Sequence, residues 1–504
     1  MSVSDSLPLR RGEVVLGAAV RPLGSFPSGW RVDGANRDPG DDPKVLKRQA
    51  KEAERAHLDY LFFGDWFSNT PDLEYTDPYL LARIDPFSAV AFLASSTSRI
   101  GLIATVNTSY SDPFTTARTA ASIDHLSGGR FGLNIVVGTE PHADANHTVS
   151  NQVGGRAAHR HAVAAEYLDV IRGIWDTWDD DAVVADAGSG TLVDWSRIDA
   201  LDHEGESFRA AGPALSLRPV QGQIPIVHSD TSARALEFAA RGAELHVVSP
   251  ANLREGVAIA RDLRAAAVAH GRAADSLAIV LPLLPVVGST RADAWAIYDR
   301  LVELVPVADA AGAATSATAA GVPRDRTASA IRRLVGVPLL DRELDDPVSL
   351  ADAERFNTAG VRLLEVVRRR SGRVPGTSRT PDYRHLLVAH LFPLPIVVGS
   401  AEDIADHIET WFRSGAADGF TVQSAYLHEQ FEAFTRGVVP ILVERGLFRA
   451  GYGTRTLRGH LGLDRPARVK PQQAEAAASA SATEAATRTT PSRASAFDGV
   501  VGVF

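Results

Sequence analysis

The sequence predicts an α/β protein built on a (β/α)8 barrel of the TIM type. The first observation is a strand–helix–strand unit. An apolar run at Ile100–Val106 is followed by a helical segment at Thr115–Ile123, and a Gly-Gly turn then leads into a second apolar run at Phe131–Val137. Neither run alternates with polar residues, which is typical of parallel strands buried on both faces. The second observation is that this alternation of strand and helix continues along the chain. The third is that neither a topological switch nor a GxGxxG fingerprint is found, which favours a closed barrel over an open sheet.

Eight apolar runs are predicted to form the barrel: Val14–Val20, Tyr60–Phe63, Ile100–Val106, Phe131–Val137, Ile224–His228, Leu245–Val248, Leu277–Val287 and Phe420–Ser424. Segments with helical spacing lie between most of them. The clearest of these helices are Lys44–His57, His161–Trp178, Ala233–Arg241 and Leu253–His270. Parallel neighbours need such crossover connections, so the helices are expected to surround the strands.

Two stretches exceed a minimal barrel. Asp179–Gly212 is acidic and rich in turn residues, which predicts a long loop or small hairpin with Trp195 and Phe208 as apolar anchors. Pro306–Tyr383 is an insertion between the last two strands and is expected to be helical over Ala351–Arg370. Both insertions, at about 179–212 and 306–383, are assigned to one barrel domain of residues 1–464.

Residues 465–504 are predicted to be a disordered tail. Arg465–Ala496 is rich in Ala, Ser, Thr and Pro and has almost no large apolar residues. Such a segment cannot bury enough apolar surface to offset the conformational entropy of folding.

The composition narrows the class of protein. Of the 504 residues 45% are hydrophobic and 22% charged, so the chain can bury a large core, and the net charge is −9. An acidic chain does not favour nucleic acid or an anionic membrane as its main partner. The absence of cysteine excludes disulfides and thiolate ligands. No membrane span or signal peptide is expected, and a cytoplasmic location fits these features.

Several short motifs, taken in order, resemble one family. They are Phe63–Asp65, Arg99–Tyr110, Ser127–Val136, Ile174–Trp178, Pro225–Val227, Gly415–Phe420, Val438–Pro440, Arg445–Arg449 and Thr456–Arg458. Between about Leu16 and Leu463 the chain resembles the bacterial-luciferase-like flavin monooxygenases, in the branch of nitrilotriacetate, EDTA and dibenzothiophene-sulfone monooxygenases.

The resemblance implies a two-component monooxygenase. A separate flavin reductase would supply reduced FMN (FMNH2), and O2 would add to the flavin to give a C4a-hydroperoxyflavin that oxygenates a small organic substrate. The bond attacked stays open between C–S or C–N cleavage, Baeyer–Villiger-like insertion and desaturation. The family commonly forms homo-oligomers, so a dimer or tetramer is expected. No catalytic side chain is assigned, because Trp66 and Phe67 stand where luciferases carry a catalytic histidine.

Polar residues end three of the predicted strands, at the mouth where barrels place their active sites. The resemblance puts Asp65, Thr105 and Asn107 beside the flavin ring and packs Val136 under it. Each has a structural alternative, since Asp65 could cap a turn and the residues around Thr105 are usual in turns.

The phosphate site departs from the family pattern. His161, Thr231 and Ser232 are the candidate phosphate contacts, the last two at the start of a helix. Ala157 stands where relatives carry a histidine, and Asp230 stands where they carry a glycine. Either His161 and an arginine rebuild the contact, or the chain binds flavin weakly.

Other chemistries were weighed on the same residues. His142 and His147 lie near acidic and amide side chains, but they lack a third convergent ligand, so no metal site is predicted. A deazaflavin-dependent oxidoreductase and a non-catalytic flavin-binding barrel stay open as alternatives. A carboxylate-based hydrolase using Asp65 and Glu140 is less favoured, because its two acids would have to converge across a cleft.

Overall fold

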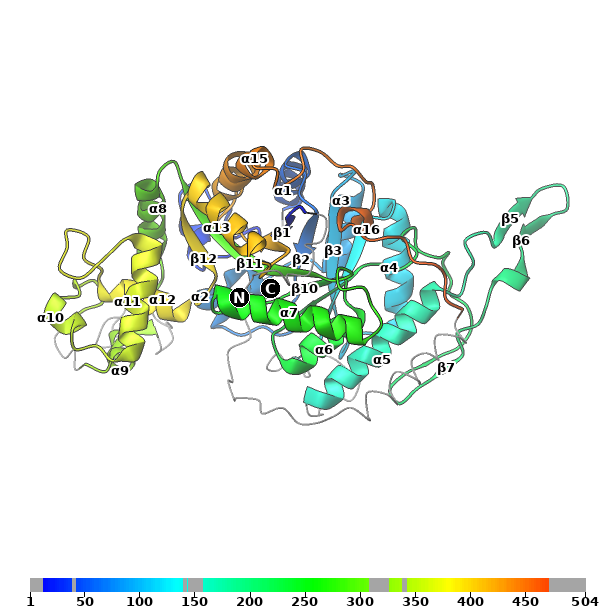
Figure 1. The fold of residues 1–504 in the computed structure, drawn as a ribbon, viewed down its shortest axis with the longest axis horizontal. Helices are drawn as coiled ribbons and strands as arrows, with labels where there is room; N and C mark the ends of the chain where they lie inside the picture. Colours follow the sequence, from blue (N-terminus) through cyan, green and yellow to red (C-terminus); the bar gives the residue numbers. More distant parts are fainter. Residues whose placement is uncertain are drawn as a thin grey trace, which may run out of the picture.

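The computed structural model describes residues 12–38, 42–138, 143, 157–307, 326–337 and 342–470. Eight parallel strands form the barrel: β1 (Val15–Ala19), β2 (Tyr60–Phe63), β3 (Gly101–Asn107), β4 (Phe131–Val136), β9 (Ile226–Ser229), β10 (Leu245–Val247), β11 (Ala278–Gly288) and β13 (Gly419–Val422). Their order is β10-β9-β4-β3-β2-β1-β13-β11, and pairing of β10 with β11 closes the ring (Figure 1). The predicted barrel is therefore confirmed, and each of its eight strands overlaps a predicted one.

Helices surround the barrel as crossovers (Figure 1). The main ones are α1 (Pro43–Arg55), α3 (Pro86–Ala94), α4 (Pro113–Ser127), α5 (Ala157–Trp175), α6 (Ala233–Gly242), α7 (Leu253–Ala269) and α13 (Ala401–Arg413). Short helices add α2 (Leu73–Thr76), α14 (Glu429–Ala433), α15 (Val439–Glu444) and α16 (Leu457–His460). Three of the crossovers begin with Asp-Pro, and in each the Asp side chain accepts a backbone N–H of the first turn. This cap followed by proline is a strong signal for a helix start.

One end of the barrel is closed by side chains. Leu457 of α16 lies against Gly101 and Gly132, and a Cβ atom at Gly101 would lie 2.6 Å from its side chain. The ring of Tyr60 similarly fills the space left by Gly17. These contacts fill the end where the strands begin, so the opposite end, where they finish, is the one available for a site.

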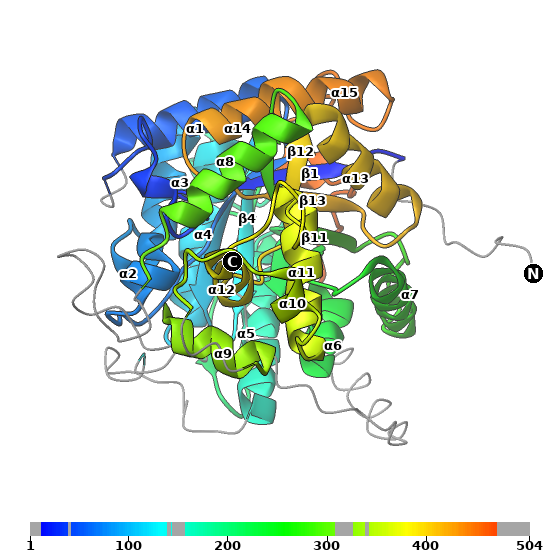
Figure 2. The ribbon, with the colours of Figure 1, turned by 90° about the vertical axis from the view of Figure 1, so that its left-hand side faces the viewer.

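The insertion between β11 and β13 forms its own hydrophobic cluster. It contains α8 (Arg291–Glu303), α9 (Ala328–Val335), α10 (Leu350–Ala353), α11 (Thr358–Ser371), α12 (Tyr383–Leu391) and β12 (Ile396–Ser400). Figure 1 shows this group at one side of the barrel, and in Figure 2 α11 and α12 lie in front of it.

Strand β12 was not predicted. It pairs with the second half of β11, from Leu284 opposite Ile396, and so extends the sheet outside the closed ring. The helix predicted at Ala351–Arg370 is interrupted, because Asn357 caps the start of α11 through its side chain.

The segment predicted as a loop or small hairpin forms two hairpins. These are β5 (Val183–Asp186) with β6 (Thr191–Val193), and β7 (His203–Glu204) with β8 (Arg209–Ala210). Phe208 is a buried anchor as predicted, but the prediction for Trp195 is wrong, since this side chain is 71% exposed. The hairpin β5–β6 projects from the barrel on the side opposite the α8–α12 group (Figure 1), and Trp195 follows this hairpin in the chain.

The predicted tail starts as packed chain. Arg465 forms an ion pair with Asp180 at 2.6 Å, and the Nε atom of Arg468 donates to the carbonyl oxygen of Asp176 at 2.7 Å. Disorder was predicted from residue 465, so the prediction is wrong for residues 465–470, and residues 471–504 lie outside the described part. In the described part of the chain, no helix combines the length and apolar character needed to cross a membrane.

Candidate functional site

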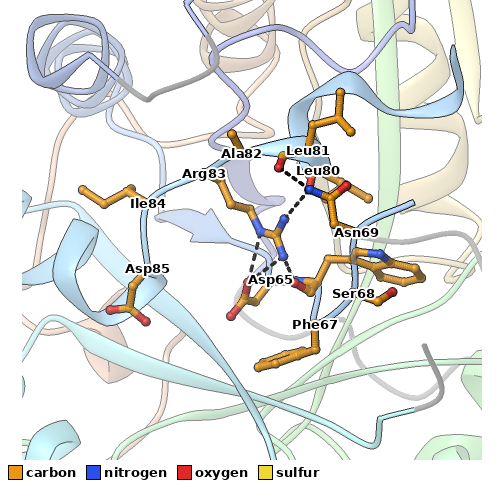
Figure 3. A pocket seen from close by; sticks show the side chains of 11 residues that line it. Asp65, Phe67, Ser68, Asn69, Leu80, Leu81, Ala82, Arg83, Ile84 and Asp85 are labelled. Carbon is orange, nitrogen blue, oxygen red and sulfur yellow. Dashed lines mark hydrogen bonds and ion pairs between the residues drawn. The ribbon is translucent and has the colours of Figure 1, made fainter. Parts of the chain in front are cut away.

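A hollow opens beside the carboxyl end of β2. Its volume is about 420 Å³, and residues 65–69 and 80–85 line it (Figure 3). Aromatic, aliphatic and charged side chains all contribute to the lining, which is the mixture expected of a small-molecule site.

Asp65 and Arg83 form an ion pair in this hollow. The Nε and Nη2 atoms of Arg83 lie 3.0 and 2.9 Å from Oδ1 of Asp65, and Figure 3 shows the two side chains facing each other. The same carboxylate oxygen accepts the N–H of Trp66 at 2.8 Å, so the turn-capping role is also present. Burial raises the pKa of Asp65, against the opposing effect of Arg83. The guanidinium also donates to the carbonyl oxygen of Leu80 and so connects the two lining segments.

Thr105 and Asn134 form a chain of hydrogen bonds inside the barrel. Ile103 belongs to the cluster that fills the barrel, and alternate residues of a strand share a face, so Thr105 and Asn107 also point inward. The hydroxyl of Thr105 donates to the carbonyl oxygen of Phe63 at 2.7 Å. Its oxygen therefore accepts from the Nδ2 atom of Asn134, at 3.0 Å. The Oδ1 atom of Asn134 is left buried with no hydrogen-bond partner among the described residues.

The amide of Asn107 is held through its oxygen, whereas that of Asn134 is held through its nitrogen. Its Oδ1 atom accepts the backbone N–H groups of Ser109 and Gly138, at 3.0 and 3.1 Å. These two bonds orient the amide, and its Nδ2 atom is buried without a hydrogen-bond partner in the described structure. Val136 pairs with Asn107 in the sheet and is partly buried. Asn107 and Asn134 thus leave one buried donor and one buried acceptor without a hydrogen-bond partner among the described residues, and native proteins leave few such buried groups unpaired.

The candidate phosphate residues lie at a neighbouring part of the mouth. His161 is in the second turn of α5 and is partly buried. It follows the described start of α5 by four residues. Thr231 and Ser232 follow β9 after one residue and are exposed, and the Ser232 hydroxyl caps α6 by accepting the N–H of Ala235.

Asp230 occupies the turn that joins β9 to α6. Its φ angle is +149°, a conformation that favours glycine and is uncommon for residues with a side chain. Its Oδ1 atom accepts the backbone N–H groups of Thr231 and Ser232, at 2.6 and 3.1 Å, and Oδ2 accepts the Ser232 hydroxyl at 2.9 Å. A carboxylate of the chain itself therefore takes the donors expected to hold a phosphate.

Two buried histidines support this turn from behind. The Nδ1 atom of His228 donates to the carbonyl oxygen of Ile135 at 2.7 Å, and its ring packs on Phe238 of α6. The Nε2 atom of His246 donates to the carbonyl oxygen of Asp230 at 2.9 Å. Burial lowers the pKa of His228 to about 4 and that of His246 to about 3. Both are therefore neutral at physiological pH.

Some of the residues considered for the site lie outside the described part of the chain, and two residues of the site were not predicted from the sequence. Glu140, His142 and His147 fall in undescribed residues, as does the side chain of Ala157. Among the described residues, no three His, Cys, Asp or Glu side chains are grouped so as to hold a metal ion. Asn134 was noted only as part of a motif. Its role depends on the Thr105 hydroxyl, which donates its proton to Phe63 and therefore accepts from Asn134. Arg83 gave no signal in the sequence.

Known proteins resemble this chain over most of its length. The family model described as "luciferase-like monooxygenase" matches residues 25–418. The chain is 32% identical to N-acetyl-S-(2-succino)cysteine monooxygenase of Bacillus subtilis (strain 168), over 91% of this chain and 98% of the relative. It is 30% identical to nitrilotriacetate monooxygenase component A of Aminobacter aminovorans, over 90% and 96%. The structure of EDTA monooxygenase from Chelativorans sp. BNC1 matches with a TM-score of 0.66 at 26% identity, over 90% and 99%. These matches confirm the resemblance that the motifs indicated.

Proposed function

Because this chain belongs to the luciferase-like family and is a flavin-dependent monooxygenase, we propose that it uses reduced FMN and O2 to oxygenate a small organic substrate. When bound, the reduced flavin supplies the electrons that activate O2. The protein's part is to orient the flavin ring, hold the substrate against it and exclude water.

The single observation that carries this proposal is a pair of buried amide atoms at the mouth, Nδ2 of Asn107 and Oδ1 of Asn134, that have no hydrogen-bond partner among the described residues. One edge of the flavin ring system presents carbonyl acceptors and a ring N–H donor. The Nδ2 atom of Asn107 can donate to such a carbonyl, and Oδ1 of Asn134 can accept from the N–H. A flavin would thus satisfy two buried groups that otherwise cost free energy.

The other predicted ring contacts lie around this pair. Val136 ends β4 beside Asn107 and would offer an apolar surface to the ring. Thr105 holds Asn134 in place. Asp65, fixed by Arg83, borders the hollow beside the mouth and is available to contact either the flavin or the substrate.

The supply of reduced flavin is assigned to a separate reductase. In support, a relative at 30% identity is named component A of its monooxygenase, which implies a second component.

A cytoplasmic location and a homodimer or homotetramer complete the proposal. Light scattering of the purified protein measures the oligomeric state directly.

The substrate is proposed to be a small organic molecule with carboxylates and a C–N or C–S bond. Nitrilotriacetate, EDTA and N-acetyl-S-(2-succino)cysteine, named in three relatives, share these features. This makes aminopolycarboxylates and thioether carboxylates the first compounds to test.

The test is an anaerobic titration of the protein with reduced FMN, followed by mixing with oxygenated buffer in a stopped-flow spectrometer. We expect saturable binding and a reoxidation trace with a transient that is neither reduced nor oxidised flavin. A trace identical to that of free reduced FMN would overturn the proposal. Binding without oxygen consumption would instead favour the non-catalytic barrel, and binding of a reduced deazaflavin alone would favour the deazaflavin-dependent oxidoreductase.

A further inference from the structure

The turn between β9 and α6 presents a carboxylate, that of Asp230, where a flavin phosphate was expected to bind. The start of a helix offers backbone N–H groups that lack partners within the helix, and these commonly bind anions. Ser232 is the N-cap of α6, and its N–H group, its hydroxyl and the N–H group of Thr231 just before it all donate to Asp230. A phosphate dianion would have to displace a carboxylate from its own neighbours and remain close to its negative charge.

The core holds Asp230 in this position. His246, which is fully buried, donates to the backbone carbonyl of Asp230 and so fixes the peptide that follows β9. The φ angle of +149° at Asp230 is unfavourable for a residue with a side chain, and such conformations persist only when the surroundings determine them. In a glycine-containing turn the same N–H groups would be open to a ligand. The side chain therefore occupies the place of a ligand.

The proton of the Ser232 hydroxyl is committed as well. It donates to Oδ2 of Asp230 and accepts the N–H of Ala235 at 3.3 Å. Its contribution to an incoming phosphate would require breaking the bond to Asp230. The proposed ring contacts, Asn107 and Asn134, lie on β3 and β4, outside this turn.

We propose that the Asp230 carboxylate takes the place of the flavin phosphate at the start of α6, so that this chain binds flavin through its ring and accepts riboflavin about as well as FMN. The inference rests on the proposed function, because it concerns the flavin that the mouth would hold. It assigns to Asp230 a role in selecting the form of the cofactor.

The experiment measures dissociation constants for oxidised FMN and for riboflavin, by flavin fluorescence, in the wild type and two variants. In the wild type we expect the two constants to agree within about threefold. Asp230→Gly frees the N–H groups, suits the backbone conformation and should tighten FMN binding by at least about tenfold, with little change for riboflavin. Asp230→Asn, which removes the charge but keeps the side-chain size, should give a smaller gain.

Inorganic phosphate provides the second readout. It should compete with FMN for Asp230→Gly and have no effect on FMN binding to the wild type beyond that of a salt of equal ionic strength. A wild type that binds FMN more than about tenfold tighter than riboflavin would overturn the inference, as would an unchanged preference in Asp230→Gly. If the wild type binds neither flavin, the proposed function itself fails, so the two failures are distinguishable.

Discussion

Asn107→Asp separates the scaffolding role of Asn107 from its proposed role in flavin binding. An aspartate at this position keeps an oxygen that accepts the N–H groups of Ser109 and Gly138. The change replaces the Nδ2 donor by a second oxygen and, when the carboxyl is ionised, adds a negative charge. The fold should therefore be retained, while the flavin carbonyl facing this atom loses its partner.

The expected loss follows from the cost of an unpaired buried acceptor. Removing one partner of a buried hydrogen bond costs about 1–3 kcal/mol. This corresponds to a dissociation constant for FMN that is weaker by roughly 5- to 140-fold.

The assay is a fluorescence titration with oxidised FMN, combined with thermal unfolding. Asn252→Asp is the matched control, since Asn252 caps α7 on the protein surface and an aspartate caps as well. The control should bind FMN as the wild type does. Unchanged FMN affinity in a folded Asn107→Asp variant would refute the argument from the mouth.

Two further predictions concern the scaffold. Leu457→Ala should lower the free energy of unfolding, measured by urea titration, by about 2–5 kcal/mol, because this side chain fills one end of the barrel. The control Leu215→Ala, at a 67% exposed position, should change it by no more than about 0.5 kcal/mol. Equal effects of the two substitutions would contradict the role assigned to Leu457. Burial opposes the imidazolium of His385, but hydrogen bonds to Asp299 and Asp382, at 3.1 and 2.5 Å, outweigh it and raise the pKa of His385. The resulting stabilisation is complete below the unfolded pKa of about 6.5 and is lost as the pH rises through the higher folded value. The urea midpoint of the wild type should therefore fall over that window more than that of His385→Gln, and parallel profiles would rule out this contribution.

The barrel strands could be predicted because each forms an apolar run in the sequence. A strand buried on both faces must be apolar throughout, and runs such as Phe131–Val137 satisfy this without help from their neighbours. Strand β12 follows different rules, since it lies outside the ring and is only partly buried. Trp195 was misjudged because a large apolar side chain usually marks burial, and the sequence does not show that its hairpin projects from the barrel.

The sequence predicted which residues lie at the site, but not the hydrogen bonds and ion pairs that these residues form. Asn107 was expected at the mouth, but the orientation of its amide results from two backbone N–H groups that come together only in the folded chain. The ion pair of Asp65 with Arg83 joins residues 18 positions apart through a loop that has no regular pattern. Asp230 was expected to repel a phosphate if it pointed inward. The structure instead turns its side chain back onto the N–H groups that follow it.

A crystal structure of the protein with FMN tests the central claim most directly. The account predicts the flavin ring inside the barrel mouth, with one edge within hydrogen-bond distance of Nδ2 of Asn107 and Oδ1 of Asn134. A flavin bound elsewhere, or one in the mouth that leaves both amide atoms without a partner, would contradict it.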